Sequence, residues 1–241
     1  MSTRNIVLFG ETGAGKSSVV NLMTGEEKAE TSPDTLHCTK HWKEYPIAFD
    51  GYNYNVFDTV ALEEPQLGVA NARNLIMKLN NEGGIDLLLF CVRAGSKLTA
   101  TVRNNYRLFY EQLCEKNVHI VLVLTGLEGE QNMEDWWIRN KDIFTKYGIF
   151  VDGHVCITAA NNLDGRGQEL YQLSRQLIRN LVREHTHHRV TDKEGATVRR
   201  GATVGSGVTD ERGGWFRRII RKLELLLGNT KHCDIGRSTV G

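Results

Sequence analysis

Short runs of leucine and β-branched residues alternate along the chain with longer segments in which apolar residues recur every three or four positions. The short runs are typical of buried strands, and the longer segments are typical of amphipathic helices. We expect strands at Asn5–Phe9, Trp42–Phe49, Asn53–Phe57, Ile85–Cys91, His119–Leu124 and His154–Ile157. We expect helices at Lys16–Thr24, Val69–Asn80, Ala100–Glu115, Glu134–Lys146 and Asp164–Arg183.

This alternation of elements predicts an α/β fold of three layers, with helices on both faces of a mostly parallel six-stranded sheet. Asp50-Gly51 lies between the second and third strands and is typical of a tight hairpin turn. One antiparallel strand is therefore expected at the edge of the sheet. We expect this domain to cover residues 1–185, which is enough chain to bury one substantial core.

The sequence changes character after His185. Residues 186–214 are rich in glycine, threonine, valine and charge but have no period, which predicts a flexible linker. In residues 215–228, apolar side chains recur at helical spacing and basic side chains lie mostly opposite them, which predicts a basic amphipathic helix. This helix could bind a partner protein or a membrane surface, or pack on the preceding domain. Residues 229–241 are expected to form a disordered tail.

Charge and cysteine content argue against several classes of protein. The chain has 30 basic and 29 acidic residues, a net charge of +1, so no overall field favours nucleic acid as a partner. Its five cysteines are widely spaced and include no Cys-x-x-Cys pair, which argues against a disulfide framework and a zinc site. No run of about 18 apolar residues spans a bilayer, and the first strand leaves no room for a signal peptide. We therefore expect a cytoplasmic protein with reduced thiols, in which Cys91 and Cys156 are buried packing residues.

A glycine-rich loop follows the first strand and leads directly into the first helix. Its sequence is Gly10-Glu11-Thr12-Gly13-Ala14-Gly15-Lys16-Ser17. Successive backbone N–H groups of such a loop converge on phosphate oxygens, and the helix N-terminus adds a favourable dipole. We expect Lys16 to reach the β- and γ-phosphates and the hydroxyl of Ser17 to ligate Mg²⁺, with Ser18 in the same cradle. The pattern predicts a P-loop nucleotide-binding protein with the fold of the P-loop NTPases.

Three further positions, in two segments, are candidates for the magnesium and γ-phosphate site. Asp58 comes at the end of a strand, where P-loop NTPases place the carboxylate that holds Mg²⁺, often through water. The polar segment 31–39 is of the kind that closes over the γ-phosphate through a threonine hydroxyl, with Thr39 as the first candidate and Thr35 as the second. An aspartate that caps a strand and an ordinary loop threonine are the simpler alternatives. The candidate catalytic residues are Lys16 and Thr39, and the candidate metal ligands are Ser17, Thr39 and Asp58.

Residues 10–25 resemble the P-loop and helix of the septin-like, immune-associated (GIMAP) and chloroplast-receptor (Toc-like) GTPases, whose helix likewise runs GKS-S-x-x-N-x-L-x-G. More closely, the chain resembles short G-domain proteins predicted in large numbers from fungal genomes. Four segments carry that likeness: Asp58–Pro65, Cys114–Lys116, Glu134–Trp137 and Asp152–Asn161. The resemblance covers about Asn5–Arg183. It implies a Ras-like G domain, GTP and GDP as ligands, Mg²⁺ as cofactor, and slow hydrolysis or a nucleotide-gated switch.

The same resemblance implies where the base would bind. GTPases end a strand with Asn/Thr-Lys-x-Asp, in which the aspartate pairs with guanine and the lysine stem packs on its ring. Thr125 and Glu128 fall at the outer positions of this pattern, and a carboxylate of either length accepts the guanine N–H protons. Gly126 stands where the lysine should be, and the alternative is that this segment is only a surface loop. Thr158 and Ala159 resemble the last GTPase element, whose backbone touches the guanine edge.

Two departures from the family pattern concern hydrolysis. Ala61 stands at the glycine of the Asp-x-x-Gly motif, whose amide contacts the γ-phosphate and pivots on hydrolysis. Leu62 stands where Ras-like enzymes place the glutamine that orients the attacking water, so intrinsic hydrolysis should be slow. Relatives without this glutamine commonly use dimerisation or another residue, so a homodimer through the G domain is one expected partner arrangement.

The sequence leaves three hypotheses about function. The first is a guanine-nucleotide-binding protein, a GTP/GDP switch with slow Mg²⁺-dependent hydrolysis. Gly126 keeps open a P-loop ATPase or an unspecific NTPase, because the lysine stem is missing. Ala61 and Leu62 keep open a scaffold that binds nucleotide without turning it over.

Overall fold

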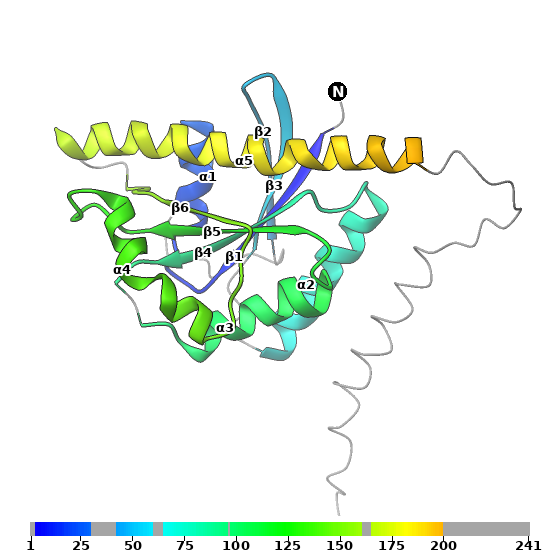
Figure 1. Cartoon of the computed structure of the whole chain (residues 1–241), viewed down its shortest axis with the longest axis horizontal. Coiled ribbons are helices and arrows are strands. Elements are labelled where there is room, and N and C mark those ends of the chain that lie inside the picture. The colour runs from blue at the N-terminus through cyan, green and yellow to red at the C-terminus, as the bar shows by residue number, and fades with distance from the viewer. Residues whose placement is uncertain (1–2, 30–41, 60–64, 96, 161–164, 200–241) are drawn as a thin grey trace, which may run out of the picture. The chain divides into compact units, whose positions relative to one another are not determined.

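The computed structural model describes five stretches of the chain: residues 3–29, 42–59, 65–95, 97–160 and 165–199. Six strands make one sheet: β1 (Arg4–Gly10), β2 (Trp42–Phe49), β3 (Tyr52–Thr59), β4 (Leu87–Arg93), β5 (His119–Thr125) and β6 (Gly153–Cys156). Their order across the sheet is β2-β3-β1-β4-β5-β6 (Figure 1). Only β2 and β3 pair antiparallel, through a turn at Asp50 and Gly51. The predicted sheet, mostly parallel with one antiparallel edge strand, is confirmed.

The helices follow the predicted order with some changes at their ends. They are α1 (Lys16–Thr24), α2 (Pro65–Asn81), α3 (Ala100–Tyr106), the π-helical segment η1 (Arg107–Leu113), α4 (Met133–Lys146) and α5 (Arg166–Arg199). Helix α2 begins earlier than expected, because a proline is well tolerated in a first helical turn. The expected helix Ala100–Glu115 is divided, because its second part hydrogen bonds in the wider π pattern, as from Cys114 N–H to the Phe109 carbonyl oxygen at 3.0 Å.

The sheet lies between two layers of helices (Figure 1). Helices α1 and α5 cover one face, where Leu8 of β1 belongs to the same buried cluster as Val20 and Ile178. Helices α2, α3 and α4 cover the other face, where Phe9 stacks on Phe109 of η1 with ring centroids 4.6 Å apart. Successive residues of β1 therefore point into two different cores, which explains why the central strands are apolar without alternation.

Helix α5 extends further than the sequence predicts. The helical spacing of apolar residues is lost after Arg183, so the sequence predicts a helix end there and a linker from residue 186. In the structure the helix continues to Arg199. Thr186 is buried, and its hydroxyl accepts a hydrogen bond from Arg4 Nη1 at 3.0 Å. This contact with β1 is distant in sequence, so no local pattern reveals it. The boundary at 185 and the linker from 186 therefore differ from the structure, in which the helix runs through residue 186 to Arg199.

The rest of the predicted C-terminal region lies outside the described residues. This holds for residues 200–214 of the expected linker, for the basic helix expected at 215–228 and for the tail at 229–241. Within the five described stretches, none of the helices combines the length and apolar character needed to cross a bilayer.

Candidate nucleotide-binding site

The glycine-rich loop joins β1 to α1 at the carboxyl edge of the parallel strands (Figure 1). Ala14 N–H donates to the Glu11 carbonyl oxygen at 3.1 Å, which closes a tight turn. Gly15 caps α1 from a left-handed conformation with φ 83°, and Val19 N–H donates to its carbonyl oxygen at 2.9 Å. The first backbone N–H groups of α1 and the positive end of its dipole therefore meet at the loop, as an anion site requires.

Gly10 ends β1 beside Cys91 of β4. A Cβ atom added to Gly10 would overlap the Cys91 carbonyl oxygen, and the φ angle of Gly10 is 154°. Both facts require glycine at this position, because any side chain would push the two strands apart. Cys91 is fully buried, as the sequence predicts for a packing residue.

Lys16 lies in the centre of the loop. Its ammonium group donates to the carbonyl oxygens of Gly10 at 3.2 Å and Glu11 at 3.0 Å. The residue is buried, so its charge acts in a medium that screens it less than bulk water does. The loop therefore presents one positive charge and several backbone N–H groups to the same small volume, which suits a polyphosphate.

Asp58 reaches the loop through the pairing of β3 with β1, which places it beside Leu8. The hydroxyl of Ser17 donates to Asp58 Oδ2 at 2.6 Å. The other carboxylate oxygen, Oδ1, is buried and has no hydrogen-bond partner among the described residues. A buried carboxylate oxygen next to a hydroxyl is the hard oxygen pair that Mg²⁺ prefers, so these residues fit the metal. The structure thus brings together the two predicted ligands that it describes.

Replacing Asp58 with asparagine is expected to stabilise the nucleotide-free protein at pH 7. Burial raises the pKa of Asp58, although the Ser17 hydroxyl and Lys16 act in the opposite direction. A carboxyl group whose pKa is raised by folding lowers the stability of the folded protein when it ionises. This loss of stability is absent below the pKa of the unfolded state, about 4, and it grows as pH rises through the higher pKa of the folded state. Removing the charge should add about 1 kcal/mol to the free energy of unfolding at pH 7.

Thermal unfolding of the nucleotide-free protein at pH 7 and near pH 4 measures this gain. The gain should vanish at the lower pH, where the wild-type carboxyl is neutral too. Asp142→Asn, on the exposed side of α4, is the matched control and should change neither value. An equal gain at both pH values would contradict the charge argument.

The predicted base segment begins against the P-loop. Thr125 ends β5, and its hydroxyl donates to the Ala14 carbonyl oxygen at 3.0 Å. Leu127 is buried and anchors the segment, and Glu128 follows it at the edge of the domain, half-buried. Thr125 therefore supports the loop with its side chain, whereas the role of Glu128 at the base stays a prediction.

Arg93 lies over Gly126, which the sequence did not indicate. Gly126 has a φ of 78°, and a Cβ atom added to it would lie 3.2 Å from Arg93 Cγ and 3.4 Å from Arg93 Nε. Arg93 ends β4 directly beside Thr125 of β5. The space where a side chain at position 126 would begin is thus lined by the side chain of a different strand. Only the pairing of β4 with β5 creates this contact.

Thr158 and Ala159 follow β6 and are both buried. The backbone N–H of Thr158 donates to Ser174 Oγ of α5 at 3.0 Å. This amide is therefore engaged by the protein itself, and the expectation that the backbone of this segment touches the guanine edge stays a prediction. The Thr158 hydroxyl is buried without a hydrogen-bond partner among the described residues. The contact expected of the Ala159 backbone stays a prediction.

The remaining predicted residues divide into two groups. Thr12, Gly13 and Ser18 lie in the loop and the first turn of α1, as the motif requires. Thr39 and Ala61 lie outside the described residues, so their roles stay predictions.

Glu11 takes part in a contact that the sequence did not reveal. Its carboxylate accepts a hydrogen bond from the hydroxyl of Thr99. Thr99 is also the N-cap of α3, where its side chain accepts from Val102 N–H. A threonine just before a predicted helix indicates the cap, but nothing local indicates its contact with the P-loop.

The fold and the site together define a P-loop nucleotide-binding protein. Residues 5–125, which are half of the chain, match the family model described as 50S ribosome-binding GTPase. The chain belongs to this GTPase family. The resemblance of its sequence to P-loop GTPases is confirmed, whereas the closer likeness to fungal G-domain proteins stays a prediction.

Several known proteins are similar to this chain. Immune-associated nucleotide-binding protein 7 from Arabidopsis thaliana is 28% identical over 187 residues, which are 72% of this chain and 58% of that protein. The chain thus spans less than two thirds of that relative. Era from Aquifex aeolicus, solved with GDP and AlF4⁻, is 16% identical with a TM-score of 0.54, over 88% of this chain and 60% of that one. A dimerisation-deficient mutant of Toc33 from Arabidopsis thaliana is 16% identical with a TM-score of 0.50, over 75% and 86%.

Proposed function

We propose that this protein binds GTP and GDP with Mg²⁺ and acts as a switch whose intrinsic GTP hydrolysis is slow. The pair formed by Ser17 and Asp58, at 2.6 Å beside the Lys16 ammonium, is the observation that carries the proposal. Lys16 and the loop amides would bind the β- and γ-phosphates, and Ser17 and Asp58 would hold the metal ion. Mg²⁺ would neutralise the phosphate charge when bound. Slow hydrolysis rests on Leu62, at the position of the water-orienting glutamine.

Arg93 supports selection of guanine despite Gly126. In GTPases that carry the complete base motif, a lysine stem covers the ring, and here Arg93 lines the place where that stem would start. A guanidinium group stacks on aromatic faces, so it can cover a purine ring as the lysine stem does. Glu128 would accept the guanine N–H protons that adenine does not offer. The pocket proposed for the base therefore consists of Arg93, Thr125, Glu128 and Ala159.

Replacing Arg93 with alanine is expected to weaken GTP and GDP binding about tenfold, because one face of the base loses its cover. Arg93→Lys should keep most of the affinity, since a lysine stem covers the same face. Competition against fluorescent GDP measures both variants. Arg107→Ala, which removes an exposed arginine from η1, is the matched control and should leave binding unchanged. Unchanged affinity in Arg93→Ala would remove Arg93 from the pocket.

One titration tests the proposed function as a whole. Purified protein is titrated with fluorescent GDP and Mg²⁺, and unlabelled GTP, GDP and ATP then compete. Displacement by guanine nucleotides alone supports the switch, equal displacement by ATP supports an unspecific NTPase, and no binding supports a degenerate scaffold. Single-turnover phosphate release over long incubation then separates a slow GTPase from a nucleotide-binding scaffold without turnover.

Two partner arrangements belong to the same proposal. A homodimer through the G domain would supply a group that orients the attacking water, which Leu62 cannot do. The molecular mass of the protein in solution, measured with GDP and with a GTP analogue, tests for this dimer. Residues 215–228 would bind a partner protein or a membrane surface through their apolar face. Co-sedimentation of the full chain with anionic vesicles separates the membrane from the protein partner.

A further inference from the structure

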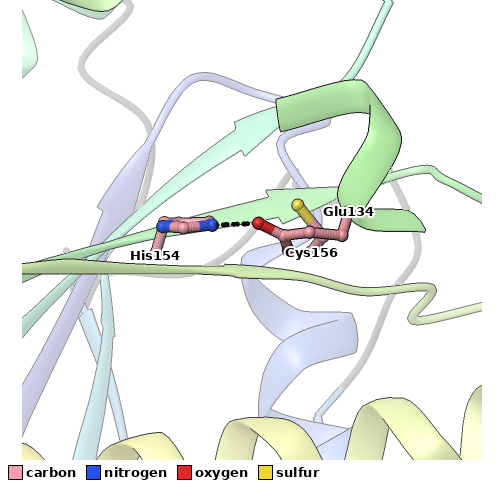
Figure 2. Close-up of side chains that lie close together, drawn as sticks. All are labelled: Glu134, His154 and Cys156. Atoms are coloured by element: carbon pink, nitrogen blue, oxygen red, sulfur yellow. Dashed lines mark hydrogen bonds and ion pairs between the residues drawn. The ribbon is translucent and has the colours of Figure 1, made fainter. Parts of the chain in front are cut away.

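Three side chains with metal-ligand chemistry converge beside the last strand of the sheet. His154 and Cys156 lie two residues apart on β6 and so project from the same face, and Glu134 lies in the first turn of α4 (Figure 2). Their ligand atoms all lie within 4.8 Å of one another. His154 Nε2 and Glu134 Oε1 are 2.6 Å apart. Glu134 and His154 are thus in direct contact, and the Cys156 sulfur lies beside them.

The surroundings hold these side chains in place but leave access from solvent. Trp137 stacks on the His154 ring with centroids 4.3 Å apart and planes 23° apart, which fixes the ring orientation. Cys156 is buried beside them. The side chains of Glu134 and His154 are 46% and 27% exposed, so an ion can reach the group from outside.

A nucleophilic role for Cys156 does not fit this arrangement. A catalytic thiol needs a base that takes its proton, whereas the Nε2 atom of His154 points to Glu134 (Figure 2). Burial, and after it the Glu134 carboxylate, raise the pKa of the Cys156 thiol to about 12, so the free thiol is unreactive.

The donor set does fit a cation. Thiolate, imidazole and carboxylate together suit Zn²⁺, whose ligand atoms lie roughly 3–4 Å apart in a tetrahedron, so closing this group takes about 1 Å of movement. The hard ion Mg²⁺ does not prefer sulfur or imidazole, which keeps this site chemically distinct from the Ser17 and Asp58 pair. Three protein ligands leave one position for water or a further ligand.

We propose that Glu134, His154 and Cys156 form a binding site for a thiophilic divalent cation, with Zn²⁺ as the best match. The site joins two segments that lead to the predicted base pocket. Helix α4 follows the segment that contains Glu128, and Cys156 lies two residues before Thr158. A bound ion would cross-link the start of α4 to the end of β6 and restrict both segments. The site itself does not depend on the proposed GTP binding.

Titration of the full-length reduced protein with Co²⁺ tests the site, because thiolate ligation gives a near-ultraviolet charge-transfer band that Zn²⁺ should abolish by displacement. Wild type is expected to show this band at one equivalent. Cys156→Ser should lose it, and His154→Gln should bind Co²⁺ at least about tenfold more weakly while keeping the thiol. Cys114→Ser, at a second buried cysteine, is the matched control and should behave as wild type.

Absence of the band in wild-type protein would overturn the proposal. So would a band that Cys156→Ser leaves intact, because another thiol would then be the ligand. Thermal unfolding shows whether each variant is folded, and a folded His154→Gln with wild-type Co²⁺ affinity would also remove the site.

Discussion

Replacing Lys16 with alanine is expected to lower the affinity for GTP and GDP by at least a hundredfold, or about 3 kcal/mol. The Lys16 ammonium is held at the loop by the carbonyl oxygens of Gly10 and Glu11, where it would meet two phosphate groups at once. Losing it removes charge-assisted hydrogen bonds in a partly buried site, where such bonds are strong. Titration with fluorescent GDP measures the change.

Two further variants make this test specific. Lys16→Met keeps the aliphatic stem and should show the same loss, because the charge rather than the packing binds phosphate. Lys28→Ala removes an exposed lysine that pairs with Glu26 at 3.3 Å, and it should leave the affinity unchanged. Wild-type GDP binding by a folded Lys16→Ala protein would refute the assignment of the phosphate site.

Replacing Gly10 with alanine should have the largest effect on stability. The new Cβ atom would overlap the carbonyl oxygen of Cys91, so β1 and β4 have to separate at the centre of the sheet. Both groups are backbone, so no side-chain rotation relieves the overlap. We expect a loss of about 3 kcal/mol or more, which lowers the unfolding midpoint by roughly 6–12 °C in a domain of this size.

Alanine substitutions at two other glycines distinguish the effect of steric overlap from the effect of backbone strain. Gly13 has a φ of 74° but open space around a Cβ atom, so Gly13→Ala should cost only about 1 kcal/mol. Gly129 has open space and no positive φ, so Gly129→Ala should change stability by less than about 0.5 kcal/mol. Thermal unfolding of the three variants should therefore give Gly10→Ala a far lower unfolding midpoint than the other two. A Gly10→Ala protein as stable as Gly13→Ala would show that the strands adjust freely.

The sequence by itself was sufficient for the parts of the protein that depend on local pattern. The phosphate loop is a contiguous motif, and its residues adopt the conformation that their glycines allow. The strands of the parallel sheet are short apolar runs because they are buried on both faces, and this burial is visible without a structure. The position of Asp58 at the end of a strand could also be predicted from the sequence, because it directly follows Val56 and Phe57.

Only the tertiary structure decided the features that join distant segments. Arg93 covers Gly126 because β4 and β5 are neighbours, and Glu134 meets His154 because α4 packs beside β6. Helix α5 continues to Arg199, past the point where its local period is lost, and Arg4 contacts it at Thr186. Each of these contacts links residues that share no sequence pattern. Their physical cause is the packing of elements against one another, which a reading of local periodicity and motif spacing does not contain.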